Sequence, residues 1–116
     1  MEDRFLQQLK KGVLEMLVLE TVCQGPTYGY ELLTSLKESS GGLFSLKEGT
    51  LYPILYRLED DGMIAAAWSN QEGRAAPKKI YSATGKGQLE REKRRDIWYR
   101  FVDTVGLFLK EDDENV

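Results

Sequence analysis

The fold of this 116-residue chain is decided by the stretch Gly49-Thr50-Leu51-Tyr52-Pro53-Ile54-Leu55-Tyr56-Arg57-Leu58-Glu59-Asp60-Asp61-Gly62. Its leucines and isoleucine recur at helical spacing, which predicts an amphipathic helix with one apolar face and a glycine stop. The opposite face combines hydroxyls, tyrosine rings and one guanidinium. That mixture suits contact with a polar partner, and duplex DNA is a candidate.

Two helices are predicted upstream of this stretch. Residues 4–24 are apolar nearly all round their second half, as in a central core helix, and Gly25-Pro26 ends them. Residues 28–39 form a second helix that Thr27 can cap, and the Ser-Ser-Gly-Gly run at 39–42 is a break.

The start of the third helix is ambiguous in the sequence. Ser45 and Glu48 have the spacing of a capping box, which places a helix start near Ser45. Pro53 conflicts with that start, because a proline inside a helix removes one hydrogen bond. Either the regular helix begins later than Ser45, or it bends at Pro53.

Downstream of Gly62 the pattern changes to short strands. Residues 64–68 and 78–82 predict a β-hairpin, and the polar connector 69–77 forms its long tip. The alanine run at 65–67 has weak strand propensity and is also compatible with a helix. The Ile80-Tyr81 pair and the turn residues favour the hairpin.

A last helix is predicted from Thr84 to about Lys110. Residues 90–96 are all charged, so this half is solvated, whereas apolar side chains recur at helical spacing from residue 97 onward. A small monomer has little left to cover such a stripe, so a second chain is the expected partner. The predicted dimer residues are Ile97, Trp98, Phe101, Val102, Val105, Phe108 and Leu109.

Composition excludes several function classes. No apolar run approaches the roughly 18 residues of a membrane span, and the N-terminus lacks a signal-peptide pattern. The single cysteine, Cys23, cannot form an intramolecular disulfide, which fits a reducing cytoplasm; it is expected to be a buried small hydrophobe. The chain has no histidine, so we expect no metal site and no cofactor, and an enzyme is disfavoured.

The formal net charge of −3 does not by itself exclude nucleic-acid binding. Four acids cluster at residues 111–114, and without them the balance is +1 (−3 minus −4). Three helices followed by a β-hairpin is the order of a winged helix-turn-helix, a mainly α fold with a small β-hairpin. In such folds the third helix enters the major groove and the hairpin tip touches adjacent DNA. The predicted DNA-binding residues are Lys47, Thr50, Tyr52, Tyr56, Arg57, Arg74, Lys78 and Lys79.

Five of these residues also have a structural interpretation. Tyr52 and Tyr56 touch DNA or pack against the wing, and Thr50 contacts phosphate or acts locally. Arg57 contacts phosphate or a guanine edge, or pairs with Asp60 or Asp61. Arg74 is a phosphate or minor-groove reader, or a solvated turn charge.

Several motifs occur together in order. They are Lys11-Gly12-Val13-Leu14-Glu15-Met16-Leu17-Val18-Leu19, Gly25-Pro26-Thr27-Tyr28-Gly29-Tyr30-Glu31-Leu32, Glu48-Gly49-Thr50-Leu51-Tyr52-Pro53, Arg57-Leu58-Glu59, Gly62-Met63-Ile64, Gly73-Arg74 and Lys79-Ile80-Tyr81 with Thr84 and Gly87. Over about residues 9–105 the chain resembles the PadR family of transcriptional regulators. It departs from the family pattern at Ala75-Ala76-Pro77, where Arg or Lys is usual.

The resemblance implies a cytoplasmic homodimeric repressor that binds a pseudo-palindromic operator in double-stranded DNA. Residues 1–83 would form the DNA-binding domain, with the first helix also packing on the dimer; residues 84–110 would form the dimerisation helix and residues 111–116 an acidic disordered tail. The short terminal helix matches the subclass that includes multidrug-responsive repressors of the LmrR type. These bind flat aromatic compounds between paired tryptophans at the dimer centre.

By spacing from Thr84 and Gly87, Trp98 falls at that tryptophan position, and Phe5, Leu9 and Val102 could line the same cavity. Without the resemblance, Trp98 reads simply as interface core. Two other functions remain open: a winged-helix module that binds a partner protein without DNA or ligand sensing, and an enzyme that uses perturbed carboxylates.

Overall fold

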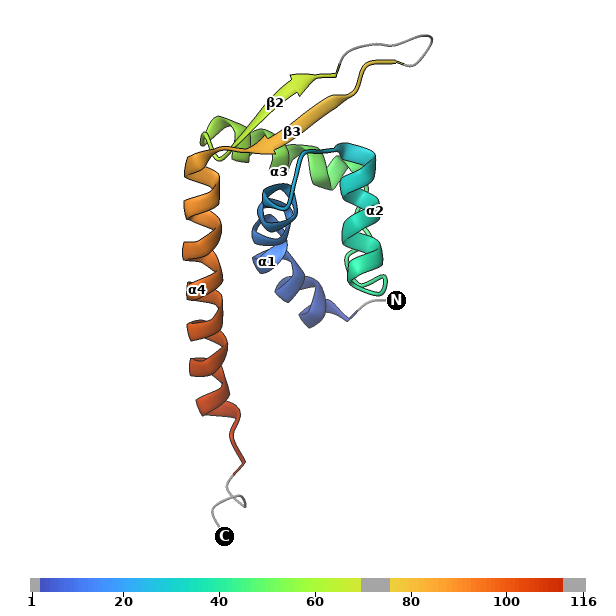
Figure 1. The fold of residues 1–116 in the computed structure, drawn as a ribbon. Coiled ribbons are helices and arrows are strands. Elements are labelled where there is room, and N and C mark those ends of the chain that lie inside the picture. Colours follow the sequence, from blue (N-terminus) through green and yellow to red (C-terminus); the bar gives the residue numbers. More distant parts are fainter. Residues whose placement is uncertain (1–2, 70–75, 112–116) are drawn as a thin grey trace.

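The computed structural model describes residues 3–69 and 76–111 (Figure 1). Within these ranges it is mainly helical with a small antiparallel sheet, as the sequence predicts. The elements are α1 (Arg4–Cys23), β1 (Thr27–Tyr28), α2 (Gly29–Ser39), α3 (Glu48–Asp60), β2 (Ile64–Trp68), β3 (Lys79–Ala83) and α4 (Gly85–Leu109). The predicted helix and strand boundaries are correct to within a few residues.

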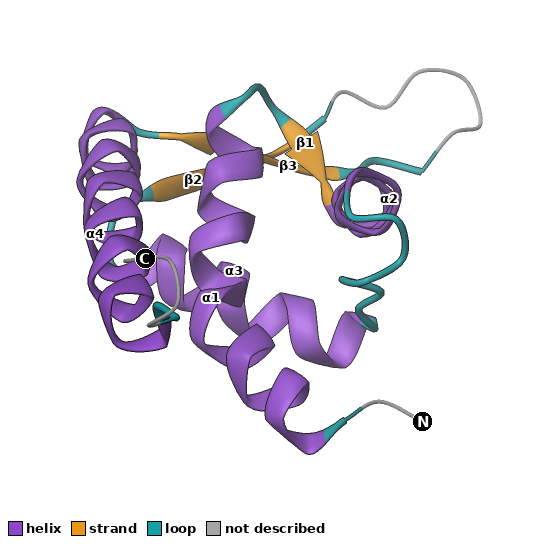
Figure 2. Cartoon of the chain, turned by 90° about the horizontal axis from the view of Figure 1, so that it is seen from below, coloured by secondary structure: helices purple, strands orange, loops and turns teal. Residues whose placement is uncertain are grey.

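The core surrounds α1, which lies between α4 and α2 (Figure 2). Val18 and Leu19 of α1 are completely buried. The predicted apolar face of α3 is confirmed, because its four apolar residues are all at most 5% exposed. The other core members are Leu14, Val22, Leu32, Leu36, Met63, Ile64 and Tyr81.

α3 begins at Glu48, so of the two predicted alternatives the structure has the helix that starts later than Ser45. Ser45 does not cap the helix; its hydroxyl donates to the carbonyl of Gly42 (2.9 Å) in the preceding loop. Lys47 occupies the N-cap in extended conformation with no side-chain capping bond. The helix therefore starts later, and Pro53 lies inside its first half.

The structure contains a third strand that the sequence did not predict. Thr27 and Tyr28 form β1, which pairs with Tyr81 and Ile80 of β3, and the sheet has the order β1-β3-β2. Thr27 is consequently not the N-cap of α2: that position is Tyr28, without a side-chain cap. The buried Thr27 hydroxyl instead donates to the Glu31 carboxylate (2.8 Å).

The junction between α3 and α4 is a tight backbone arrangement. Gly62 has a φ of 75°, and Met63 N–H donates to the Leu58 carbonyl (2.9 Å), which is the Schellman pattern of a helix end. Thr84 caps α4 as predicted: its hydroxyl accepts from Gly87 N–H (3.0 Å) and donates to the Gly62 carbonyl (2.7 Å). Thr84 thus joins the C-terminal end of α3 to the start of α4.

α4 extends beyond the rest of the described chain as a single arm (Figure 1). Its predicted apolar stripe is on the surface of the monomer; for example, Phe101 is 60% and Phe108 84% exposed. None of the described helices is long and apolar enough to cross a membrane. Residues 112–116 of the predicted disordered tail, 111–116, lie outside the described residues.

Candidate functional site

The outer face of α3 carries most of the predicted DNA-binding residues of this helix. Thr50, Tyr56 and Arg57 are exposed, and Lys47 lies exposed at the N-terminal end. They share this side because the apolar residues between them turn inward to the core. α3 lies beneath the β2–β3 hairpin (Figure 1), and Lys79 of β3 lies beside Tyr56 and Glu59 of the helix.

Tyr52 lies at the flank of this face, where it contacts α2. It is only half-buried, but its phenolic oxygen lies against the α-carbon of Gly29, and its ring is 6.1 Å from that of Tyr56. Both rings belong to α3, one turn apart, and it is the contact of Tyr52 with Gly29 that links the helix to α2. Tyr52 therefore packs against the start of α2, and Tyr56, 51% exposed, is the tyrosine that presents its ring to solvent.

The two described lysines of the wing are held over aromatic rings. Lys78 Nζ lies 4.2 Å from the centroid of the Tyr28 ring, and Lys79 Nζ lies 5.6 Å from that of Tyr56. Lys79 is also 4.0 Å from the Glu59 carboxylate, which offsets part of its charge. Lys79 therefore lies beside α3, whereas Lys78 lies over β1 on the other side of β3. Arg74, the remaining predicted wing residue, lies outside the described residues.

Tyr81 lies beneath this surface with its side chain fully buried. Burial raises the pKa of its phenol to about 12, with smaller contributions from the nearby Tyr56, Glu59 and Tyr52. No described residue offers its hydroxyl a hydrogen-bond partner. Tyr81 is therefore a neutral core group at physiological pH.

Arg57 makes an ion pair across the molecule, and its partner is neither Asp60 nor Asp61. Its Nε donates to Glu15 Oε1 of α1 (3.2 Å), while the side chain remains 59% exposed. The other oxygen of Glu15 accepts from Arg94 Nη1 of α4 (3.2 Å). α3 is thus connected to α4 through a single carboxylate of α1.

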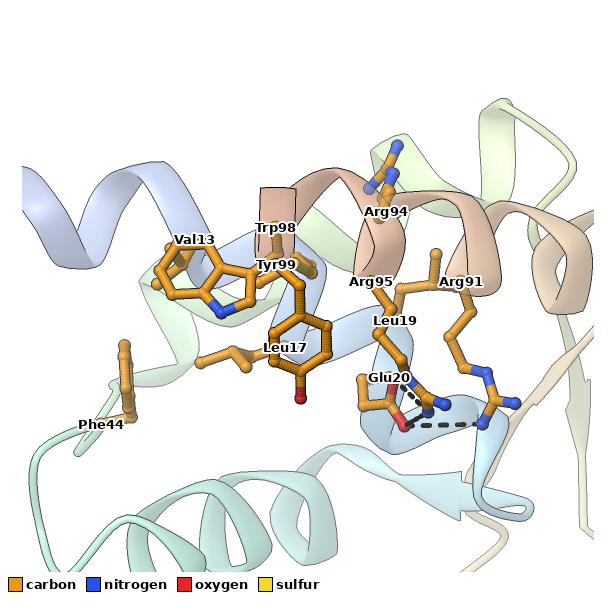
Figure 3. Close-up of a pocket in the computed structure, with 11 residues that line it drawn as sticks. Val13, Leu17, Leu19, Glu20, Phe44, Arg91, Arg94, Arg95, Trp98 and Tyr99 are labelled. Carbon is orange, nitrogen blue, oxygen red and sulfur yellow. Dashed lines mark hydrogen bonds and ion pairs between the residues drawn. The ribbon is translucent and has the colours of Figure 1, made fainter. Parts of the chain in front are cut away.

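A cavity of about 590 Å³ lies between α1 and α4 (Figure 3). Trp98 and Tyr99 form its apolar part together with Val13, Leu17 and Phe44. At its other end Arg91 and Arg95 both reach Glu20, at 3.5 and 3.1 Å. The cavity therefore offers an aromatic surface beside a group of arginines.

A second hollow of about 660 Å³ adjoins the first and also contains Trp98. Leu9 and Phe101 line it, and so does Arg94. Of the predicted ligand residues, the monomer brings Trp98 and Leu9 together at this hollow. Phe5 and Val102, 66% and 43% exposed, line neither cavity but lie on the open surface.

Sequence reasoning missed two contacts of this site. Glu15 was known only as part of a motif, and nothing local indicates that its carboxylate meets arginines 42 and 79 residues away. Tyr28 supports Lys78 because β1 pairs with β3, and a two-residue strand leaves no periodic signal.

Cys23 is partly buried, and burial raises the pKa of its thiol.

The helical core, the wing and the α3 surface define a winged helix-turn-helix protein. Residues 18–93 match the model of the transcriptional regulator PadR-like family, and the chain belongs to that family. The negative transcriptional regulator PadR of Bacillus subtilis is 33% identical over 78 residues, which are 67% of this chain and 42% of that protein.

Solved structures of the same family have the same fold. A PadR family transcriptional regulator from Eggerthella lenta is 33% identical, with a TM-score of 0.82 over 93% of this chain and 91% of that chain. A PadR-like transcriptional regulator from Bacillus cereus is 31% identical, with a TM-score of 0.76 over 90% of this chain and 99% of that chain. The predicted family and fold class are therefore confirmed.

Proposed function

We propose that this transcriptional regulator is a cytoplasmic homodimeric repressor that inserts α3 into the major groove of a pseudo-palindromic operator. The observation that carries the proposal is the exposed outer face of α3 with Lys79 of the wing beside it. Thr50, Tyr56 and Arg57 are exposed on the helix, Lys79 lies beside it, and Lys78 lies over Tyr28 of β1. Hydroxyls and a guanidinium can read bases or hold phosphates, whereas the lysines add sequence-independent attraction.

Dimerisation through α4 completes the reading surface. The arm exposes an apolar stripe that a free monomer would leave in water, and a second copy of the same stripe is a self-complementary partner. Leu9 of α1 is also exposed and shares a hollow with Trp98 and Phe101 of the stripe, and Phe5 is exposed on the same helix α1. A two-fold dimer would place two α3 helices in successive major grooves, roughly 34 Å apart.

A small planar hydrophobic effector is the proposed ligand. Trp98 lines both hollows between α1 and α4, so an aromatic compound can stack on it. In a dimer, Val102 and Phe5 would close the same space from the surface. Such a compound releases DNA only to the extent that it binds the DNA-free arrangement of the dimer more tightly.

DNA binding is tested by fluorescence anisotropy on the DNA upstream of the protein's own gene, in a salt series. We expect affinity to fall steeply with salt, and Arg57→Ala to weaken binding to the operator by about 1–3 kcal/mol. An unchanged affinity and salt slope in Arg57→Ala would show that the DNA-binding face is assigned wrongly.

Effector binding is tested by titrating planar hydrophobic drugs against a Trp68→Phe variant, in which Trp98 is the one remaining tryptophan. Stacking should quench its emission. A flat spectrum would remove Trp98 from the ligand site. If wild-type protein binds no DNA in a salt-dependent way and instead forms a complex with another protein through α4, the chain is an interaction module rather than a repressor.

A further inference from the structure

The Glu15 carboxylate on α1 joins two arginines that come from different helices. Oε1 accepts from Nε of Arg57 on α3, and Oε2 accepts from Nη1 of Arg94 on α4, each at 3.2 Å. Each carboxylate oxygen therefore accepts from one guanidinium, so the two arginines are bound to opposite oxygens of one group. Its side chain is 34% exposed, so the contact is partly shielded from water.

Arg94 is fixed from further directions. Its Nε donates to Glu90 Oε2 one turn earlier on α4 (2.9 Å), and its Nη2 lies 3.8 Å from the sulfur of the buried Met63. Arg94 also lines both hollows that contain Trp98. Whatever occupies these hollows therefore meets the guanidinium that holds one oxygen of Glu15.

Arg57 is held differently, by its Nε alone in the described part of the chain. The two terminal amino groups of its guanidinium take no part in that bond, and the side chain is more than half exposed on the α3 surface. A guanidinium is a rigid planar fork, so fixing one edge orients the other. Glu15 therefore directs the free edge of Arg57 outward.

We propose that Glu15 is a positioning residue for DNA binding, which orients Arg57 and ties that orientation to the cavity through Arg94. The inference rests on the proposed DNA-binding function. When Arg94 keeps its bond to Glu15, the carboxylate stays beside α3 and presents Arg57 to the duplex. An occupant that draws Arg94 away leaves Glu15 with one anchor, and Arg57 loses its fixed direction.

The sign of the effect separates positioning from ordinary electrostatics. Removing an acid from a DNA-binding surface normally raises affinity, because the phosphates lose a repulsive charge. Positioning predicts the opposite for Glu15→Ala, namely weaker operator binding by about three- to tenfold. Glu15→Gln should restore part of the loss, since its amide oxygen can still accept from Arg57 Nε.

The experiment is a set of operator titrations with a double-mutant cycle. Glu15→Ala and Arg94→Gln should each weaken binding in the wild-type background, and Glu15→Ala should no longer weaken it in an Arg57→Ala background. Glu92→Gln is the matched control: it removes the same charge from an exposed position of α4 and should leave affinity equal or slightly higher. Circular dichroism melting of each variant identifies any loss of fold.

Two results would overturn the proposal. Glu15→Ala could bind the operator as tightly as Glu92→Gln or more tightly, which would make Glu15 a simple repulsive charge. Alternatively, its loss could persist in the Arg57→Ala background, which would make its role general to the fold. Failure of the proposed function is distinct, because wild-type protein would then show no salt-dependent operator binding in the first titration.

Discussion

The phenolic end of Tyr52 on α3 lies directly against the α-carbon of Gly29, the first residue of α2. A β-carbon at position 29 would overlap the tyrosine hydroxyl and the adjacent ring carbon. Because glycine has no side chain, there is room at position 29, and Tyr52 occupies that room. Through this contact the first turn of α2 positions the flank of the recognition helix.

Gly29→Ala should lower the free energy of unfolding by about 1–3 kcal/mol, because Tyr52 has to leave its place. Chemical denaturation measures the change. Gly49→Ala is the control: no atom lies within 4 Å of a β-carbon built there, so alanine should be neutral or stabilise α3 by up to about 1 kcal/mol. Equal stability of the two variants would contradict the contact. Adding Tyr52→Leu to Gly29→Ala should recover part of the loss.

Gly87→Ala should be more harmful than Gly29→Ala. A β-carbon at this position would meet the backbone carbonyl of Met63, which cannot rotate away as a side chain can. We expect a loss of at least about 2 kcal/mol in unfolding free energy. Gly85→Ala lies in the same first turn of α4 in open space and should retain wild-type stability. If the two variants are equally stable, the close approach of Gly87 to the Met63 carbonyl does not limit stability.

The buried Tyr81 makes stability depend on alkaline pH. Its folded-state pKa of about 12 exceeds the value of about 10 for an unfolded tyrosine, so the native state keeps a proton that the unfolded state releases. The stabilisation is present below pH 10 and is lost as pH rises towards 12, by about 2 kcal/mol. Denaturation of wild type and Tyr81→Phe across this range measures the difference. Parallel pH profiles would contradict it.

Lys78 and Lys79 should contribute unequally to DNA binding. Lys79 shares its charge with Glu59, whereas Lys78 rests on the face of Tyr28. Lys78→Ala should reduce the slope of affinity against salt by about one and weaken all DNA sequences alike, and Lys79→Ala should have a smaller effect. Lys93→Ala, at an exposed position of α4, is the charge control. If the salt slope of Lys78→Ala equals that of Lys93→Ala, Lys78 does not contact the DNA.

The α4 stripe predicts a specific effect on the oligomeric state. Val105→Glu places a charge in the middle of the stripe and should convert the dimer into monomers, because an unpaired carboxylate is costly to bury. Leu107→Glu is the matched control: Leu107 is 74% exposed and projects from the opposite side of the helix. Sedimentation velocity separates the two outcomes. If both variants dimerise as wild type does, the stripe is not the interface.

The elements of this fold could be predicted because their signals are local. The leucines of residues 49–62 repeat at helical spacing, Gly62 permits the positive φ that ends the helix, and Thr84 caps the helix that follows. Side chains close in sequence determine each of these features. The order of helices and hairpin then implied a winged helix without further information.

The details of the site depend on contacts between distant residues, and these only the tertiary structure decided. Thr27 joins a sheet rather than capping a helix because it pairs with Tyr81 of β3. The two residues are 54 positions apart in the sequence (81 minus 27). Arg57 finds Glu15 rather than its acidic neighbours because α1 packs under α3. The sequence by itself determined the helices, the hairpin and the apolar stripe, since periodicity and capping act within a few residues. Which side chains share a surface depends on how those elements pack, and packing is a property of the whole chain.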